Sequence, residues 1–191
     1  SELIMSFLKS LSSSQKRRKI LRVSLYAIFA TYLVFCADFY FRQERYLLEP
    51  NVNPPGYRET KFSYVPFTLS GAAINGKAAT IHYRKYRTIG TPRNEAVFYL
   101  HGNKGNMNKC EFQIEFMLEL GYDVWTMDYR EYGDSDGKIS EEALKKDADA
   151  VYNKILAEVD AESIVIWGRS FGSGVAASVA ASATDNHKPK M

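Results

Sequence analysis

The second half of the chain alternates between two hydrophobic patterns. Apolar runs with few polar positions occupy 96–100, 124–128 and 164–167, as in strands that helices cover on both faces. Between these runs, apolar residues recur at helical spacing over about 106–120 and again over 144–159. Strands and helices that alternate in this way predict right-handed βαβ units, and therefore an α/β fold with a mostly parallel sheet and helices on both faces.

Each predicted helix has an apolar face and a local boundary signal. The first should bury Cys110, Ile114, Met117 and Leu118 on one side and stop at Gly121. Ser140 is a suitable N-cap for the second helix. The apolar stripe of that helix consists of Leu144, Ala148, Val151, Tyr152, Ile155, Leu156 and Val159.

Two strands of a different kind precede these units. Polar and apolar positions alternate at 67–69 and again at 80–84, as in strands with one solvated face. Asn75-Gly76 between them tolerates the positive φ of a tight hairpin turn. We therefore expect two antiparallel edge strands, with His82 as an ordinary face residue of the second.

The N-terminal residues follow neither pattern. An uncharged apolar run covers 23–37, and it continues to Phe41 with only Asp38 as an interruption. A membrane-spanning helix requires roughly 20 apolar residues, a length that this run reaches if Arg22 places its charge at the interface. We therefore predict a single transmembrane signal anchor over 20–41.

Two other interpretations of the apolar run stay open. A cleaved signal peptide requires small residues at the third and first positions before the cut, and Phe35 does not suit cleavage after Ala37 or before Cys36. A buried amphipathic helix is the other alternative, because Tyr26 and Tyr32 are also suited to packing in a core.

Charge and proline content divide the rest of the N-terminal part. A basic cluster within 1–19 predicts a cytoplasmic N-terminus and a domain on the extracytoplasmic side. Prolines at 50, 54 and 55 predict an extended juxtamembrane linker over 42–60, rather than a helix. The α/β domain should then occupy 61–191.

Composition excludes several classes of function. The chain has 191 residues and a formal net charge of +3, and its basic excess is local rather than a broad nucleic-acid footprint. Cys36 and Cys110 imply no disulfide framework, and His82, His101 and His187 lack the spacing of metal ligands. We expect no metal, no cofactor and no nucleic-acid partner.

Chemistry is indicated most clearly by the segment 164–174. It reads as a buried strand, a forced turn and the start of a small-residue helix, with Gly168-Arg169-Ser170-Phe171-Gly172 at the turn. Glycines on both sides leave room for a sharp bend that exposes the serine hydroxyl, as in a nucleophile elbow. The helix start that follows would direct its positive end at developing negative charge. Ser170 is therefore the candidate nucleophile.

A second segment has the same spacing but a different context. Gly133-Asp134-Ser135-Asp136-Gly137 follows Arg130, Glu131 and Tyr132, and no helix starts directly after it. It lies in a polar loop of turn formers, so Ser135 is not predicted to be a nucleophile.

Three distinctive segments follow the carboxyl ends of predicted strands: His101-Gly102-Asn103, the loop 128–137, and Ser170. In open α/β sheets, sites form beyond the carboxyl ends of the strands. The three segments should therefore meet at one edge.

These segments resemble the motifs of the α/β-hydrolase superfamily, in particular its membrane-anchored serine hydrolases. That group shows His-Gly-Asn after the third strand, Asp-Tyr-Arg-Gly-Tyr-Gly after the fourth and Gly-x-Ser-x-Gly after the fifth. The corresponding segments here are 100–106, 128–133 and 168–172, and the resemblance extends from about Phe62 to the end of the chain. Glu131 stands where the group has glycine, which affects the shape of that loop.

The resemblance implies roles for named residues. Ser170 would attack an acyl carbonyl, and the backbone N–H groups of Phe171 and Asn103 would hold the oxyanion. Four residues would support the motifs: His101, Gly102, Gly168 and Gly172. In this assignment His101 shapes its loop and is not the catalytic base.

The triad acid and histidine follow the nucleophile in this superfamily, on loops after later strands. After Ser170 the chain offers only Asp185 and His187, just past the next helix. That connector should run opposite to the active-site edge, so neither residue is assigned to the triad. We expect the acid and the histidine to lie outside this chain, which begins at Ser1 and has the features of a partial sequence.

Three functions fit these observations. The first is a serine hydrolase of esters, thioesters or amides, acting at a membrane on a small molecule, a lipid or an acylated protein. The second is a membrane-anchored, catalytically dead scaffold of the same fold. The third is a haloperoxidase-like enzyme or a transferase.

Overall fold

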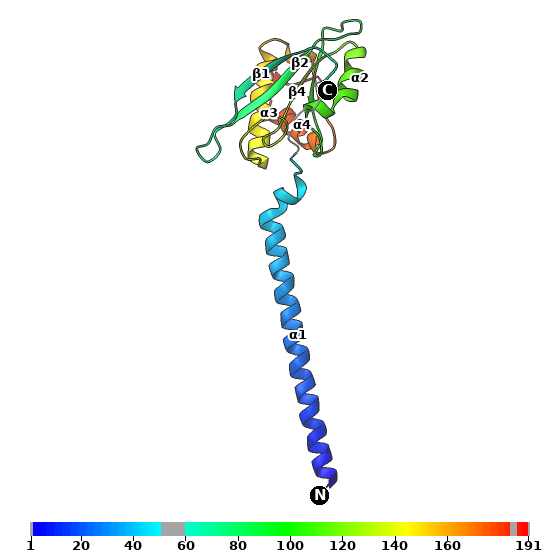
Figure 1. Cartoon of the computed structure of the whole chain (residues 1–191), viewed down its shortest axis with the longest axis vertical. Helices are drawn as coiled ribbons and strands as arrows, with labels where there is room; N and C mark the ends of the chain where they lie inside the picture. Colours follow the sequence, from blue (N-terminus) through cyan, green and yellow to red (C-terminus); the bar gives the residue numbers. More distant parts are fainter. Residues whose placement is uncertain (1, 51–59, 184–186, 191) are drawn as a thin grey trace. The chain divides into compact units, whose positions relative to one another are not determined.

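The computed structural model describes residues 2–50, 60–183 and 187–190. The chain divides into two compact units, Ser1–Tyr46 and Leu47–Met191. The first unit is a long helix, and the second is a sheet with helices packed on it (Figure 1).

Helix α1 spans Glu2–Leu47. Within it, Gln15–Glu44 is long and apolar enough to cross a membrane, with a best window of mean hydropathy 1.9 and no buried residues. Its large apolar side chains are exposed, which argues against the buried core helix.

The helix also extends further than the sequence predicted. Residues 42–47 belong to α1, so the prediction of an extended linker over them is wrong. These positions hold good helix formers, and Arg42 pairs with Asp38 one turn earlier at 2.9 Å. Proline disfavours the helical conformation of the residue before it, so Pro50 disfavours the helix from Glu49 onward. Residues 51–59 of the predicted linker lie outside the described residues.

The second unit is built on a five-stranded mixed sheet. In chain order its strands are β1 (Tyr64–Ser70), β2 (Thr80–Tyr86), β3 (Ala96–Leu100), β4 (Asp123–Met127) and β5 (Ile164–Gly168). Their order across the sheet is β1-β2-β4-β3-β5. The pairs β3–β4 and β3–β5 are parallel, whereas β2 is antiparallel to both of its neighbours.

The first two strands form the predicted antiparallel pair. Asn75 and Gly76 have φ of 51° and 74° in the turn between them, as the Asn-Gly sequence predicts. Of these two strands, β1 lies at an edge of the sheet, whereas β2 is internal because it also pairs with β4. The prediction of two edge strands is therefore half right; alternation reports one solvated face, not the number of strand partners.

Helices cover both faces of the sheet (Figure 1). The 3₁₀ turn η1 (Met107–Lys109) precedes helix α2 (Glu111–Glu119), which packs with Val97, Tyr99 and Val124 in one hydrophobic cluster. On the other face, α3 (Glu141–Leu156) and α4 (Phe171–Ser182) pack with Phe98, Leu100 and Trp125. The turn η2 (Ala161–Ser163) leads into β5. Each central strand therefore contributes side chains to both cores.

The predicted face of α2 and the cap of α3 are confirmed, whereas Val159 of the predicted α3 stripe lies beyond the end of that helix at Leu156. Cys110, Ile114, Met117 and Leu118 are buried, and the chain leaves α2 through Gly121 at φ +95°. Ser140 caps α3 by accepting a hydrogen bond from the Ala143 N–H at 3.1 Å.

Candidate active site

The segment around Ser170 is a strand, a strained turn and a helix, as predicted. β5 ends at Gly168 and α4 begins at Phe171. Ser170 between them has φ 51° and ψ −119°, and its side chain is exposed. Such a backbone conformation costs a non-glycine residue about 1–3 kcal/mol, and it persists only where the surroundings hold it.

Two glycines hold the elbow by close backbone approach. A Cβ on Gly168 would lie 2.2 Å from the Gly172 carbonyl oxygen. A Cβ on Gly172 would lie 2.2 Å from the carbonyl oxygen of Leu100, at the end of β3. Both obstructing atoms are backbone, so larger residues at these positions would force the strand and the helix apart.

The loop after β3 lies against the elbow. The Arg169 N–H donates to the Leu100 carbonyl at 3.0 Å. A Cβ on Gly102 would be 3.3 Å from the Arg169 carbonyl oxygen and 3.6 Å from Ser170 Cβ. The structure therefore brings the His-Gly-Asn segment and Ser170 together.

The two N–H groups expected to bind an oxyanion are available. In the part of the chain that the structure describes, neither the Phe171 N–H nor the Asn103 N–H donates a hydrogen bond, and Ser170 Oγ has no partner. The Phe171 N–H belongs to the first turn of α4, where N–H groups have no intrahelical acceptor. The arrangement suits a negatively charged oxygen at the start of a helix.

His101 is buried beneath this loop. One ring nitrogen, Nδ1, lies 2.9 Å from the Gly102 carbonyl oxygen, and the ring packs against Tyr129 at 4.2 Å between centroids. Burial lowers the pKa of His101 to about 4, and the Gly102 hydrogen bond opposes this only in part. His101 is fully covered, and its loop-shaping role stays a prediction.

Asp128, at the end of β4, lies next to His101. Burial raises the pKa of Asp128 to about 6, although the Met107 N–H donates to Oδ1 at 2.7 Å and the Asp134 N–H interacts with the other oxygen. His101 Nε2 is 3.9 Å from Asp128 Oδ1. At neutral pH the histidine is uncharged, so the contact is not an ion pair.

Ser135, in the second Gly-x-Ser-x-Gly segment, is buried and fully engaged. Its hydroxyl donates to the Asp128 carbonyl at 2.8 Å and accepts from the His82 N–H at 2.9 Å. It joins the loop after β4 to β2, which is a structural task and leaves the hydroxyl inaccessible.

The C-terminal residues run along the opposite edge of the sheet. The Tyr152 hydroxyl of α3 donates to the His187 carbonyl at 2.8 Å. The Lys190 N–H donates to the carbonyl of Ile164, the first residue of β5, at 2.8 Å. Ser170 follows the other end of this strand. His187 therefore does not approach the nucleophile; Asp185 lies outside the described residues.

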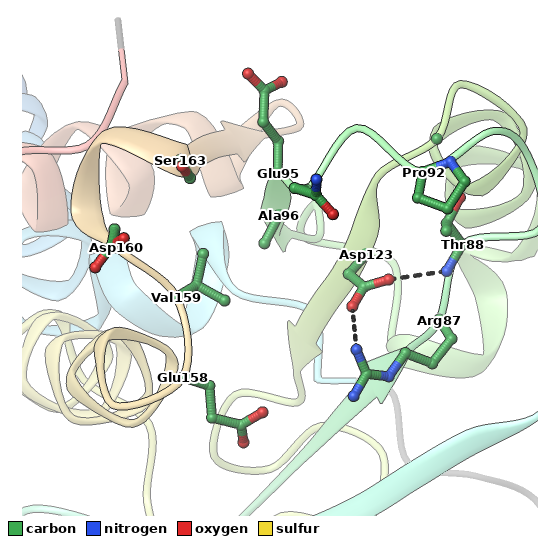
Figure 2. Close-up of a pocket in the computed structure, with 12 residues that line it drawn as sticks. Arg87, Thr88, Pro92, Glu95, Ala96, Asp123, Glu158, Val159, Asp160 and Ser163 are labelled. Atoms are coloured by element: carbon green, nitrogen blue, oxygen red, sulfur yellow. Dashed lines mark hydrogen bonds and ion pairs between the residues drawn. The ribbon is translucent and has the colours of Figure 1, made fainter.

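A polar cavity of about 390 Å³ also lies at that opposite edge (Figure 2). Ala96 at the start of β3 and Asp123 at the start of β4 line it. Asp123 accepts from Arg87 at 2.8 Å and from the Thr88 N–H at 3.0 Å, the dashed lines of Figure 2. This cavity is separated from Ser170 by the length of the strands, so it is not the candidate catalytic site.

The sequence did not reveal two polar contacts at the active-site edge. The Asn103 side chain binds the Leu47 carbonyl, the Glu49 N–H and the Tyr132 hydroxyl. Nearby, Arg130 forms a buried ion pair with Asp147 at 2.6 Å. Partners of Asn103 stand up to 56 positions away. Close to these residues in the sequence, the residue types themselves were the only indication that such polar contacts could form.

The chain is similar in sequence to known proteins. The family model described as alpha/beta hydrolase fold matches residues 95–188. Lysophosphatidylserine lipase ABHD12 of Danio rerio is 38% identical over 95 residues, which are 49% of this chain and 25% of that protein. Protein ABHD12B of Homo sapiens is 34% identical over 90 residues, 46% of this chain and 25% of that protein.

Solved structures agree on the fold. An alpha-beta hydrolase from Vibrio vulnificus has a TM-score of 0.54 at 26% identity and covers 66% of this chain and 42% of its own. An esterase of Pyrococcus furiosus has a TM-score of 0.54 at 20% identity, over 71% of this chain and 54% of its own.

The chain spans about a quarter of the length of these curated relatives. The residues that the family model matches, 95–188, include the strand, elbow and helix described above. The chain is therefore a member of the α/β-hydrolase superfamily and contains part of its fold.

Proposed function

We propose that this chain carries the nucleophile and the oxyanion-binding loops of a serine hydrolase that acts on acyl esters, thioesters or amides. The supporting observation is the Ser170 elbow: an exposed hydroxyl at φ 51° beside two N–H groups without acceptors among the described residues. Attack by Ser170 Oγ on an acyl carbon would place the developing oxyanion near the Phe171 and Asn103 N–H groups. Loss of one such donor typically lowers kcat by about 10²- to 10³-fold.

A lipid acyl ester is the substrate class that we propose first. The curated relatives include proteins named lysophosphatidylserine lipase. The chain also contains a helix that is long and apolar enough to hold the domain at a membrane. A substrate with one acyl chain would reach such a domain from the bilayer surface.

We further propose that α1 is a single-pass anchor with a cytoplasmic N-terminus. Lys16, Arg17, Arg18, Lys19 and Arg22 precede the apolar run, and basic residues flank membrane helices on the cytoplasmic side. Protease added outside right-side-out vesicles should then digest the domain. Protection of the domain under these conditions would contradict this orientation.

The test of catalysis uses the complete gene product in its membrane. A fluorophosphonate probe should label the protein once, and peptide mapping should find the adduct on Ser170. Lysophospholipid hydrolysis should be lost with the labelling in Ser170→Ala and retained in Ser178→Ala, a control in the same helix. Lack of labelling in the unsubstituted protein would favour the scaffold of the same fold.

A further inference from the structure

We propose that the Asn103 side chain is a positioning group, through which the segment Leu47–Glu49 fixes the loop after β3 in its oxyanion-binding conformation. The segment is called the strap below. This inference rests on the proposed serine hydrolase function, because it assigns a task to the side chain of a residue whose backbone N–H is an oxyanion donor.

The side chain of Asn103 uses both ends of its amide. Its Nδ2 donates to the Leu47 carbonyl, and its Oδ1 accepts from the Glu49 N–H at 2.8 Å. The same Oδ1 accepts from the Tyr132 hydroxyl at 2.9 Å. The paired bonds to residues 47 and 49 use the amide's donor and its acceptor at once, which fixes the orientation of the side chain. Three segments distant in sequence therefore meet at Asn103.

The strap is itself held by the hydrophobic core. Leu48, between the two hydrogen-bonded residues, is only 6% exposed and belongs to the core cluster under α3 and α4. Burial of a leucine side chain stabilises its position more than an exposed ion pair would. The ion pair between Lys104 and Glu49, at 3.2 Å, is largely exposed and adds little.

Tyr132 supplies the third contact from a rigid neighbourhood. It is fully buried, and its ring packs near His101 at 5.4 Å and Tyr129 at 5.8 Å between centroids. Tyr129 in turn donates from its hydroxyl to the His101 carbonyl at 2.9 Å. Asn103 is thus held between this aromatic group and the strap.

Apart from the Asn103 contacts, the loop is held mainly by His101 beneath it, whose Nδ1 lies 2.9 Å from the Gly102 carbonyl oxygen. Within residues 102–105, the backbone hydrogen bond present among the described residues is local, from the Gly105 N–H to the Gly102 carbonyl at 3.2 Å. Gly102 and Gly105 are also the residue type with the greatest backbone freedom. Loss of the Asn103 contacts would therefore let the Asn103 N–H move away from Ser170, and a displacement of about 1 Å can lower the rate by 10²-fold.

The strap follows α1 directly in the chain, since α1 ends at Leu47. The residues that continue the candidate membrane helix therefore also complete the support of the active site. We infer that substitutions in the strap reduce turnover without touching any group that contacts substrate.

The experiment compares variants of the complete gene product in its membrane. Asn103→Ala keeps the backbone N–H but removes all three side-chain contacts, and Leu48→Ala loosens the strap without altering the loop. Lys104→Ala is the matched control in the same loop. We expect kcat for a short-chain ester to fall by roughly 10- to 100-fold in Asn103→Ala, with KM within about threefold, because oxyanion contacts form in the transition state. Lys104→Ala should change kcat less than about twofold.

Leu48→Ala should lower kcat in the same direction, and the double variant should be no slower than Asn103→Ala alone, because both changes break one connection. An unchanged kcat in Asn103→Ala, with only a lower Tm, would overturn the proposal. So would a double variant whose two effects multiply.

Amide hydrogen exchange gives a readout that does not need catalysis. Exchange in residues 101–105 should accelerate in Leu48→Ala and stay unchanged in Lys104→Ala. Unchanged exchange in Leu48→Ala would overturn the connection itself. If the unsubstituted protein shows no Ser170-dependent labelling, the proposed hydrolase function fails, and exchange still decides whether the strap holds the loop.

Discussion

Ser170 and Ser135 occupy the centres of two segments with the same Gly-x-Ser-x-Gly spacing, 168–172 and 133–137. Ser170 stands between a strand and a helix, with φ 51° and an exposed hydroxyl. Ser135 lies in a loop, 6% exposed, with its hydroxyl bonded to the Asp128 carbonyl and the His82 N–H.

The difference comes from what surrounds each segment. An apolar strand before Gly168 and a small-residue helix after Gly172 force a tight bend whose backbone cannot engage the hydroxyl. Polar turn formers around Ser135 instead fold the hydroxyl inward, where it satisfies two backbone groups. The five-residue pattern therefore specifies only the spacing of glycine and serine. The hydrophobic periodicity of the flanking segments determines whether the serine hydroxyl is exposed.

The largest expected effect separates the two serines chemically. Ser170→Ala in the complete gene product should abolish fluorophosphonate labelling, because it removes the exposed hydroxyl at the elbow. Ser135→Ala should retain full labelling stoichiometry but lose about 1–3 kcal/mol of stability, since two buried backbone groups lose their partner. Labelling and urea unfolding measure the two quantities. Labelling that survives Ser170→Ala and disappears in Ser135→Ala would reverse the assignment.

Gly172→Ala should break the elbow without removing the nucleophile. The added Cβ would meet the carbonyl oxygens of Leu100 and His101 at 2.2 and 2.5 Å, and neither atom can move alone. We expect a destabilisation of about 3 kcal/mol or more, with the loss of probe labelling.

Gly174→Ala is the matched control for this substitution, because a Cβ there meets nothing within 4 Å. In a helix interior this change should stabilise by about 0.5–1 kcal/mol and preserve labelling. Equal effects of the two substitutions would show that close packing at Gly172 does not maintain the elbow.

The loop around Ser135 also contains a pH-dependent element, since the Asp134 N–H interacts with Asp128. The pKa of Asp128 is raised from 3.8 to about 6 in the folded protein, so its contribution to stability is present at low pH and is lost as pH rises through 6. The pKa of His101 is lowered from 6.5 to about 4, so its contribution is present above 6.5 and is lost as pH falls towards 4. The two slopes oppose each other between about pH 4 and 6.5.

We therefore expect the contributions of Asp128 and His101 to the pH dependence of the unfolding free energy to nearly cancel over this window. In Asp128→Asn only the slope from His101 should remain, so that the free energy of unfolding rises by roughly 3 kcal/mol from pH 4 to 6.5. His101→Gln should show the opposite slope. Urea unfolding at several pH values measures both, and parallel profiles in all three proteins would contradict these protonation states.

The parts of the fold that the sequence predicted are those with local causes. The runs at 96–100 and 164–167, the cap at Ser140 and the Asn75-Gly76 turn each depend on neighbours within a few positions. Ser170 could be preferred over Ser135 for the same reason.

What the sequence could not predict depends on distant partners. Nothing near Asn103 indicates that its amide meets residues 47 and 49, because these contacts span 54 to 56 positions. The helix at 42–47 was missed because the prolines after it were given more weight than the helix formers within it. The internal place of β2 likewise depends on β4, some 40 residues further on, and a strand pattern does not record its neighbours.

The smallest expected effect concerns Glu131, in the loop that leads to Ser135. Glu131 has φ 62°, a region that favours glycine, and its carboxylate accepts from the Ile139 N–H at 3.0 Å. Glu131→Gly would relieve about 1 kcal/mol of backbone strain but remove a hydrogen bond worth about 1 kcal/mol and increase the freedom of the unfolded chain. These terms nearly cancel, so the free energy of unfolding should change by less than about 1 kcal/mol, with labelling of Ser170 unaffected.

The control variant Glu131→Gln keeps an acceptor oxygen and the backbone strain, so it separates the two terms. It should match the unsubstituted protein in urea unfolding. The free energy of unfolding could instead fall by more than 2 kcal/mol in Glu131→Gly and stay unchanged in Glu131→Gln. That result would show that the hydrogen bond from the Ile139 N–H to the Glu131 side chain outweighs the backbone strain and holds the Ser135 loop in place.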